Sequence, residues 1–379
     1  MREDSNEFLV TPWEVRGKVD YARLVAEFGL TPLNQELYKR LTELAGGTHK
    51  LLRRRIFFAH RDLDWILDKY EQGEKFYLYT GRGPSGHTHL GHMVPWFLTK
   101  WLQDRFDVKL YFQMTDDEKF LFKPELTLEK TRRYALDNAL DVIALGFNQD
   151  KTRIFLDTDY IGVLYKIALG CAKKITFSTV RATFGFTESS NIGQIFFTSI
   201  QAAPAFIESF ISEKNVPCLI PLAVDQDPHF RVARDIAPKL GFYKPAIFHS
   251  KFLPSLSGAG KMSSSEAMSA IFTTDSPDAV RKKIWNAFTG GRPTIAEQKE
   301  KGGNPSICPV FYYYAFIFEE DDGALEERRL RCMSGDLLCG ECKEELIGRI
   351  VEFLEEHQHK RERARDLLDK FLLKDEETF

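Results

Sequence analysis

Residues 77–92 read YLYTGRGPSGHTHLGH. The apolar-aromatic run Phe76–Tyr79 predicts a short strand, and Gly81–Gly86 predicts a turn. Apolar residues at helical spacing from His92 to Phe106 predict a helix. Glycines let backbone N–H groups approach a phosphate closely, and a helix start adds positive partial charge. We therefore expect a strand–turn–helix unit suited to phosphate binding, although it is neither a Walker A loop nor a dinucleotide fingerprint.

Strands and helices continue to alternate beyond this unit. Further strands are predicted at Val108–Met114, Arg153–Leu156, Pro217–Val224 and Ala246–His249, and helices at Leu128–Leu145 and Pro228–Leu240. This order predicts an α/β fold with a parallel sheet covered on both faces. Such open sheets bind ligands at the carboxyl ends of their strands.

Three regions are expected along the chain. Residues 1–70 read as an N-terminal extension that packs on the next domain, with short helices at Tyr21–Phe28 and Asn34–Leu44. Residues 71–275 are the Rossmann-like domain. No strand pattern appears in residues 276–379, which predict an all-helical domain ending in one long helix, Arg349–Leu373.

Composition excludes several classes of protein. The 379 residues are 43% apolar and 28% charged, as in globular domains, and the net charge of −3 is not that of a uniformly basic nucleic-acid wrapper. RNA contacts would need local basic groups, although each such group is more often a solvated helix face. The candidates are Lys50 with Arg53–Arg55, Arg281–Lys283, and Lys360 with Arg361, Arg363 and Arg365.

The N-terminal stretch indicates no secretory signal, because MREDSNEF is charged and has no apolar core. No uninterrupted apolar run approaches the roughly 18 residues of a membrane span. We therefore expect a cytoplasmic protein with no membrane association.

Two short motifs carry the chemistry. HLGH places His89 and His92 three residues apart, on one helix face. Taken alone, this spacing also fits a metal-binding pair or two ordinary surface histidines. Lys261–Ser265, KMSSS, is a Ser-rich loop with one cation, which is a common pattern when it occurs alone.

Together the two motifs resemble the HIGH and KMSKS signatures of class I aminoacyl-tRNA synthetases. Seven further segments look like tryptophanyl-tRNA synthetases of the eukaryotic and archaeal type, in the family's order. They are PWEV near residue 12, YLYTGRGPS at 77–85, QMTDDEK at 113–119, FGFT at 184–187, IQAAP at 200–204, AVDQDPHFRVAR at 223–234 and GGNP at 302–305. The resemblance implies a tryptophan–tRNA ligase, which forms tryptophanyl-adenylate and pyrophosphate from L-tryptophan and ATP and then charges tRNA(Trp). Residues 71–275 would be catalytic and residues 276–379 would bind the anticodon.

The resemblance assigns residues to ATP: Gly81, Arg82, Gly83, His89, Gly91, His92, Lys261, Met262, Ser263, Ser264 and Ser265. Adenylate formation gathers negative charge at the phosphates, so preorganised donors and cations do most of the catalysis. Mg²⁺ would be bound largely through ATP oxygens. Ser264 replaces the second lysine of the signature, so Lys261 must supply the loop's main charge. The turn between Ser85 and His89 is one residue shorter than in the animal enzymes.

A second set is assigned to tryptophan: Tyr79, Gln113, Thr115, Glu118, Lys119, Gln201, Gln226 and Phe230. Indole offers one N–H donor and no acceptor, so a selective pocket needs aromatic walls and an acceptor. By resemblance, Tyr79 and Gln113 contact the indole nitrogen, while Glu118, Gln201 and Gln226 hold the ammonium. Phe230 would be a ring wall and Lys119 would lie near the carboxylate. Singly, Tyr79 also fits a core aromatic and Asp116–Glu118 an acidic helix start.

The resemblance also places Arg292 and Lys343 near the anticodon and implies a homodimer. An acidic residue follows that Arg in some relatives, where this chain has Pro293. Four cysteines in the same region, Cys308, Cys332, Cys339 and Cys342, follow the spacing C-x23-C-x6-C-x2-C. Such a set can hold zinc or a [4Fe–4S] cluster, as a similar set does in some relatives. The alternative is four reduced cysteines without metal.

Two other functions remain open at this point. A tyrosyl-type class I synthetase would share the fold and the mechanism. An inactive paralogue could act as an RNA-binding or signalling module, but such a protein would usually have lost a histidine of HLGH or Lys261, and all are present.

Overall fold

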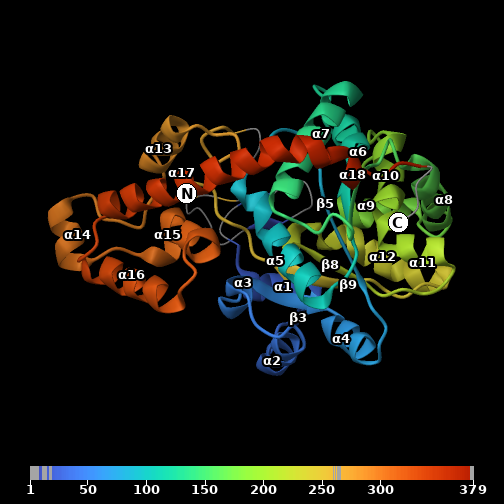
Figure 1. Ribbon diagram of the computed structural model, residues 1–379, viewed down its shortest axis with the longest axis horizontal. Coiled ribbons are helices and arrows are strands. Elements are labelled where there is room, and N and C mark those ends of the chain that lie inside the picture. The colour runs from blue at the N-terminus through green and yellow to red at the C-terminus, as the bar shows by residue number, and fades with distance from the viewer. Residues whose placement is uncertain are drawn as a thin grey trace.

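The protein is described here from a computed structural model, which covers residues 8–10, 15–16, 19–258, 260, 262 and 266–375. Lys261 and Ser263–Ser265 of the second motif, and residues 12–14 of PWEV, lie outside the described residues. Figure 1 shows a sheet-containing part toward one end, a smaller group of helices at the other, and a long helix running between them.

A seven-stranded sheet forms the centre of the larger part. Five neighbouring strands, β9, β8, β5, β6 and β7, run parallel to one another, which confirms the Rossmann-like prediction. The expected strands appear with ends shifted by no more than three residues. In spatial order they are β3 (Thr31–Pro32), β4 (Phe57–Arg61), β9 (Ala246–Ser250), β8 (Cys218–Ala223), β5 (Tyr77–Arg82), β6 (Leu110–Met114) and β7 (Thr152–Leu156).

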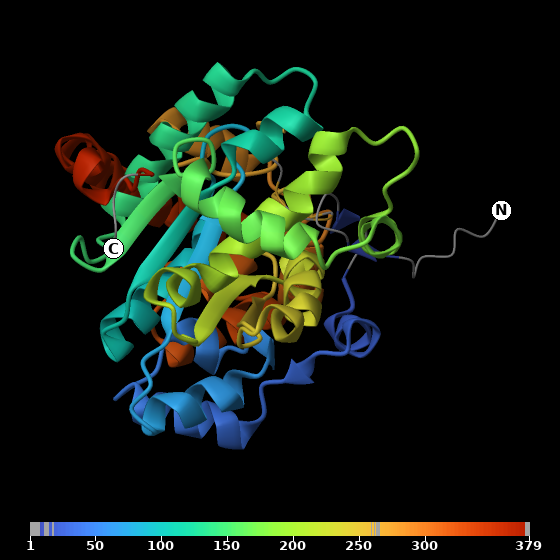
Figure 2. The same cartoon turned by 90° about the vertical axis from the view of Figure 1, so that its right-hand side faces the viewer.

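Helices cover both faces of this sheet (Figure 2). Successive strand residues point to opposite faces, so Leu78 and Phe112 join one apolar cluster while Tyr79 and Tyr111 join the other. The first cluster lies under α5 (Leu90–Phe106) and α7 (Leu128–Ala144). The second lies under α8 (Ile161–Ala172), α10 (Ile192–Ala202), α11 (Ile207–Ser212) and α12 (Asp227–Leu240). Between these elements lie α6 (Asp116–Phe122) and α9 (Phe177–Phe184).

The strand order creates a crevice next to β5. The chain leaves β5 toward β6 and β7, and later returns to place β8 and β9 on the other side of β5. The direction of winding therefore reverses between β5 and β8. Loops diverge at such a point and leave room for a ligand at the carboxyl ends of the strands.

The N-terminal extension contributes to the sheet itself, which the sequence did not predict. Helices α1 (Tyr21–Phe28) and α2 (Gln35–Leu44) are close to expectation, but β4 pairs antiparallel with β9, and β3 pairs with β4. The extension also holds β1 (Leu9–Val10), β2 (Val15–Arg16), α3 (Lys50–Arg53) and α4 (Leu63–Glu71). Two residues are too few for the period of β3 to show, so its pairing with β4 defines it, and β4 in turn is held by its pairing with β9.

The basic residues of α3 and the Arg54 that follows it form ion pairs with the C-terminal region. Arg53 and Arg54 each place Nε 2.7 Å from a carboxylate oxygen of Asp322, and Lys50 is paired with Glu320. Arg54 also donates to the carbonyl oxygen of Glu319, at 2.6 Å. These cations hold the extension against the C-terminal helices, so the RNA-binding alternative for this group is not needed to explain them.

The C-terminal region is helical, as expected. It contains α13 (Pro277–Trp285), α14 (Ile295–Lys301), α15 (Pro309–Tyr313), α16 (Asp322–Ser334), α17 (Cys339–Ala364) and α18 (Leu368–Phe371). The predicted helix Arg349–Leu373 was wrong at both ends, since α17 begins ten residues earlier and ends at Ala364. After α18, the Leu373 N–H donates to the carbonyl oxygen of Ile154 at 2.8 Å. Leu373 is thus attached beside β7, at the edge of the central sheet.

One stretch, Ile192–Ser212, is long and apolar enough to cross a membrane by length and composition. It was not singled out from the sequence. It comprises α10, a short 3-10 turn and α11, and about 67% of its most apolar window is buried inside the protein. Its apolar side chains, such as Phe197 and Ile200, belong to the core beneath the sheet.

Candidate active site

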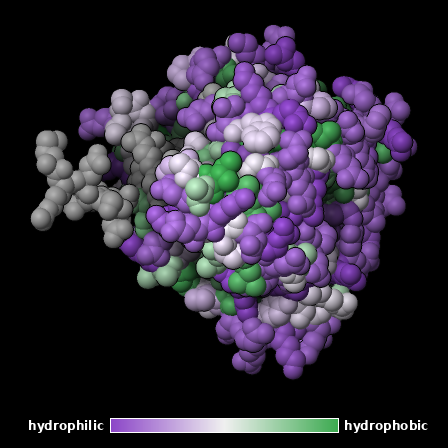
Figure 3. Space-filling view, turned by 90° about the vertical axis from the view of Figure 1, so that its left-hand side faces the viewer, coloured by the Kyte–Doolittle hydropathy of each residue, from purple (hydrophilic) through white to green (hydrophobic). Residues whose placement is uncertain are grey.

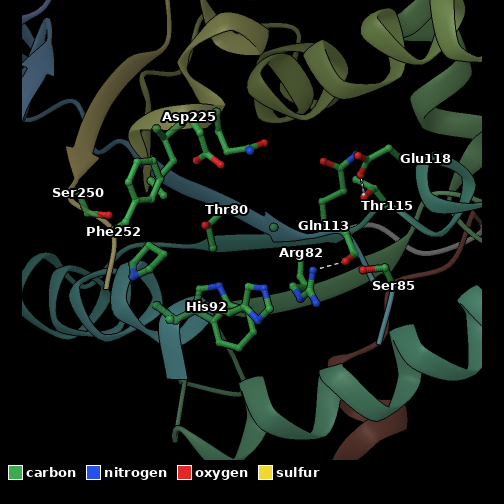
Figure 4. Close-up of a pocket in the computed structure, with 18 of the residues that line it drawn as sticks. Thr80, Arg82, Ser85, His92, Gln113, Thr115, Glu118, Asp225, Ser250 and Phe252 are labelled. Atoms are coloured by element: carbon green, nitrogen blue, oxygen red, sulfur yellow. Dashed lines mark hydrogen bonds between the residues drawn. The ribbon is translucent and has the colours of Figure 1, made fainter. Parts of the chain in front are cut away.

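A cavity of about 460 Å³ opens at the carboxyl ends of β5, β6, β8 and β9. Figure 4 shows its labelled side chains converging from both sides of the strand that carries Thr80. Every residue assigned above to ATP or tryptophan that the structure describes lines this cavity. They are Tyr79, Gly81, Arg82, Gly83, His89, Gly91, His92, Gln113, Thr115, Glu118, Lys119, Gln201, Gln226, Phe230 and Met262.

The turn after β5 forms one end of the cavity, and two of its glycines make close contacts, Gly81 with backbone and Gly83 with side-chain ends. A Cβ on Gly81 would lie 2.8 Å from the backbone oxygen of Gln113, and a Cβ on Gly83 would lie 2.0 Å from Cε of Lys119. The turn therefore packs directly against β6 and α6. Burial lowers the pKa of Arg82 to about 10, so its guanidinium remains charged at neutral pH.

The two histidines of HLGH stack at the start of α5. Their ring centroids are 3.4 Å apart, and the backbone N–H of His89 donates to Nδ1 of His92 at 3.2 Å. Because Nδ1 accepts this bond, the His92 ring carries its proton on Nε2. The ring thus presents a hydrogen-bond donor at this end of the cavity.

Met262, the described residue of the second motif, lies next to the first motif. Met262 is 4% exposed, and a Cβ added to Gly91 would lie 3.0 Å from its sulfur. The segment after the motif also pairs with the turn, since the N–H of Leu90 donates to the oxygen of Ile271 and the N–H of Thr273 to that of Thr88, both at 3.0 Å. The tertiary structure thus brings together two motifs that are about 170 residues apart in the sequence.

The opposite end of the cavity is closed by a buried hydrogen-bond network. The Tyr79 hydroxyl donates to Oε1 of Gln113. Nε2 of Gln201 donates to the Tyr79 hydroxyl at 2.7 Å and to Oε1 of Gln113 at 3.1 Å. Phe230 packs edge-on against Tyr79, with ring centroids 5.6 Å apart. The three polar side chains therefore meet beside an aromatic wall.

Glu118 lies between the two ends and remains ionised. Burial alone would raise the pKa of its carboxyl, but Lys119 at 2.5 Å and the Thr115 hydroxyl at 2.6 Å oppose this and leave the pKa below its usual value (Figure 4). The carboxylate is 7% exposed. A buried carboxylate at the cavity wall favours binding of a cationic ligand group.

Several residues of the site were not singled out from the sequence. Asp225, Ser250 and Phe252 line the cavity near β8 and β9. Asp157 lies behind Gln113, accepting from its Nε2 with both carboxyl oxygens, at 2.8 and 3.0 Å. Asp157 directly follows a predicted strand, and Gln113 is the second-last residue of another; this position was the available signal. Side-chain partnership across strands, however, is set only by the register of β6 and β7.

The two residues assigned to tRNA lie outside the cavity and differ in exposure. Arg292 is exposed, although its Nε donates to the Gly302 oxygen at 2.9 Å. Lys343 is only 8% exposed, and its Nζ donates to the carbonyl oxygens of Trp285 and Ala287, both at 2.8 Å. Lys343 therefore supports the segment that carries Arg292, and a direct RNA contact would require it to give up these bonds.

The four cysteines of the C-terminal region do meet, around a small cavity of about 20 Å³ that Arg328 also lines. Among the described residues, however, no three His, Cys, Asp or Glu side chains are placed to share one metal ion. Burial raises the pKa of Cys342 to about 12, so this thiol is protonated in the structure as it stands. The arrangement does not support the predicted zinc or [4Fe–4S] cluster.

Comparisons with known proteins agree with this geometry. The family model of class I tRNA synthetases (W and Y) matches residues 71–355. The chain is 54% identical to the tryptophan–tRNA ligase of Pyrobaculum calidifontis, over 97% of this chain and 98% of that one. Tryptophanyl-tRNA synthetase of Plasmodium falciparum superposes with a TM-score of 0.87, at 41% identity, over 93% and 97% of the chains. The enzyme from Encephalitozoon cuniculi bound to tryptophan gives 0.85, at 39% identity, over 94% and 98%.

Proposed function

This chain belongs to the class I tryptophanyl-tRNA synthetases and ligates tryptophan to tRNA at the expense of ATP, and we propose that the cavity beside β5 is where the amino acid is activated. One observation supports the proposal: residues from distant segments of the chain meet in a single cavity. All described residues assigned to ATP or tryptophan line this one cavity, although they come from two distant motifs and four tryptophan-related segments.

Tryptophan is assigned to the buried end. The indole ring would lie against Phe230, with its N–H directed at the Tyr79 and Gln113 oxygens. Glu118, Gln201 and Gln226 would bind the ammonium, and Lys119 would lie near the carboxylate. The tryptophan present in the Encephalitozoon cuniculi relative supports an indole pocket in this fold.

ATP is assigned to the turn and the HLGH helix start. Backbone N–H groups at Gly81–Gly83, the Arg82 guanidinium and Nε2 of His92 are donors at this end, where in-line attack on the α-phosphate accumulates negative charge. Lys261 belongs here by its motif and would stabilise the departing pyrophosphate. ATP chemistry in this family implies Mg²⁺, which we propose is bound mainly through the phosphate oxygens and neutralises the leaving group.

The anticodon is assigned to the C-terminal helices. Trp285 and Phe288 are 45% and 43% exposed on either side of the segment that Lys343 holds, and Arg292 follows them. Unstacked RNA bases bind by stacking on aromatic or guanidinium groups. Figure 3, which faces this end, shows hydrophobic side chains interrupting a mainly hydrophilic surface.

A homodimer in the cytoplasm completes the proposal. Ile161, Tyr165 and Leu169 form an exposed stripe along α8, each between 38% and 48% exposed, and α8 packs beside α10. In a dimer with its twofold axis near α8, this stripe would be buried between the two subunits. We expect Tyr165→Glu to convert a dimer to a monomer in size-exclusion chromatography with light scattering. A monomeric wild type would contradict the proposal.

The activity test is ATP–pyrophosphate exchange with each of the twenty amino acids. Exchange with tryptophan alone is the expected result. Exchange with tyrosine would keep the fold and mechanism but contradict the assignment of the indole pocket. No exchange with any amino acid would contradict the assignment of the cavity as the activation site.

A further inference from the structure

Asp157 holds one end of the Gln113 amide. Gln113 is the second-last residue of β6, Asp157 directly follows the neighbouring strand β7, and both side chains are fully buried. Nε2 of Gln113 lies 2.8 and 3.0 Å from the two carboxyl oxygens of Asp157. Asp157 does not line the cavity, so it can influence a ligand there only through Gln113.

This contact determines which atom of the amide faces the ligand. With Nε2 held by Asp157, Oε1 points toward Tyr79 and Gln201, and both donate to it. An amide oxygen accepts two hydrogen bonds, so an indole N–H would take the place of the Gln201 donor, which the proposed function assigns to the ammonium. A flipped amide would place its NH₂ group against the NH₂ group of Gln201, and would leave two donors facing each other without an acceptor. The arrangement therefore permits one orientation of Gln113.

We propose that Asp157 is a positioning residue that fixes the Gln113 oxygen toward the cavity and so makes this end of the pocket an acceptor for the indole N–H. The inference rests on the assignment of this end to tryptophan. It adds the residue that gives the pocket its polarity. Indole has a donor and no acceptor, so a pocket end that presents oxygen selects it, and a pocket end that presents NH₂ repels it.

The surroundings of Asp157 favour the neutral acid. Burial first, and then the neighbouring carboxyl of Asp117, raise the pKa of Asp157 well above its usual range. A protonated carboxyl still offers a carbonyl oxygen to Gln113, while its hydroxyl can donate to Asp117. Asparagine has the same shape and the same pattern, one acceptor and one donor group. Asp157→Asn should therefore keep the Gln113 orientation, whereas Asp157→Ala should not.

The test compares tryptophan with its benzothiophene analogue, in which sulfur replaces the indole N–H at nearly unchanged shape. ATP–pyrophosphate exchange is measured for the wild type, Asp157→Asn and Asp157→Ala. In the Ala variant we expect kcat/KM for tryptophan to fall about 10- to 100-fold, because a buried amide loses its partner and its orientation. The value for the analogue should change far less. The Asn variant should retain most of the wild-type preference for tryptophan.

If Asp157 only stabilised the fold, its substitution would affect tryptophan and the analogue alike. If the Ala variant lost activity equally with both substrates, or if the Asn variant lost the preference for tryptophan as fully as Ala, the inference would be overturned while the proposed function stood. Wild-type protein that does not exchange with tryptophan would overturn the proposed function and the inference with it. Thermal unfolding checks that each variant folds, and Asp157→Leu, which fills the same space without an acceptor, replaces Ala if Ala does not.

Discussion

The tryptophan end of the cavity is closed by buried side chains that hydrogen-bond to one another, whereas the phosphate end is a half-exposed turn built mainly from backbone. Gln113 and Tyr79 are at most 1% exposed, and each contact between them is made before any ligand arrives. Gly81, by contrast, is exposed, and Arg82 and His92 are half-buried. Under the proposed assignment, the comparison teaches that selection of the amino acid would rely on preorganised polarity, while nucleotide binding would rely on donors at an open edge.

Different secondary-structure elements also support the two ends of the cavity. Asp157 and Gln201 support the tryptophan end from within the sheet and its covering helices. The phosphate turn is held by α7, where Asn138 donates to the Gly86 oxygen at 3.1 Å and Asp137 lies 3.1 Å from Nδ1 of His87. The same helix is bound by α17, because Arg361 contacts Asp137 at 2.7 Å and Asp141 at 2.5 Å. The C-terminal helix thus reaches the ATP end and not the tryptophan end.

The largest effect is expected from His92→Ala. Removal of a donor that acts on charge developing in the transition state should lower kcat for pyrophosphate exchange by about 10²- to 10³-fold. Tryptophan Kd, measured by calorimetry without ATP, should change little, because His92 lies at the other end. His359→Ala, on α17 away from the cavity, is the matched control. Comparable losses in kcat and in tryptophan affinity would show that the two ends are not separate.

A smaller effect, of opposite type, is expected from Glu118→Gln. Loss of the carboxylate weakens the charged hydrogen bond to the ammonium, which should raise tryptophan KM about 10- to 100-fold with a modest change in kcat. The exposed Glu125→Gln serves as control. A fall in kcat with KM unchanged would instead assign Glu118 to the phosphate chemistry.

The smallest effect on activity is expected from Arg361→Ala. ATP KM should rise while tryptophan KM stays nearly constant, because only the phosphate turn depends on α7 and α17. Stability should fall by about 3 kcal/mol at neutral pH, since a buried carboxylate loses its partner. An equal rise in both KM values would remove the distinction between the two supports. The exposed Arg363→Ala is the control.

The pH dependence of that variant follows from Asp141. Burial opposes its ionisation, but His357 and Arg361 hold the pKa of Asp141 below its usual value of 3.8. A lowered pKa stabilises the fold above the unfolded-state value, and the contribution disappears as pH falls through the folded-state value. The stability difference between wild type and Arg361→Ala should therefore be largest near neutral pH and shrink below about pH 4. Urea unfolding at several pH values measures it.

Much of the fold was predictable from local patterns. Strand–helix alternation with period-2 and period-3.6 apolar spacing placed β5 to β9 and α5, α7 and α12 within a few residues. The strands β3 and β4 were missed because segments as short as Thr31–Pro32 have no period to detect and depend on pairing with a distant strand. The predicted helix Arg349–Leu373 was misplaced for a related reason, since the start of α17 at Cys339 and the attachment of Leu373 beside β7 are decided by packing.

The sequence by itself determined which chemical groups are available: the glycine turn, the stacked histidines, and the Tyr, Gln and Glu side chains of the tryptophan segments. These are local choices of residue type, and motif spacing reports them. The tertiary structure alone decided how these groups are supported. Only strand register placed Asp157 behind Gln113, and only helix packing turned Lys343 inward and joined α17 to the phosphate turn, because a contact between distant residues has no signature in a single chain's order of amino acids.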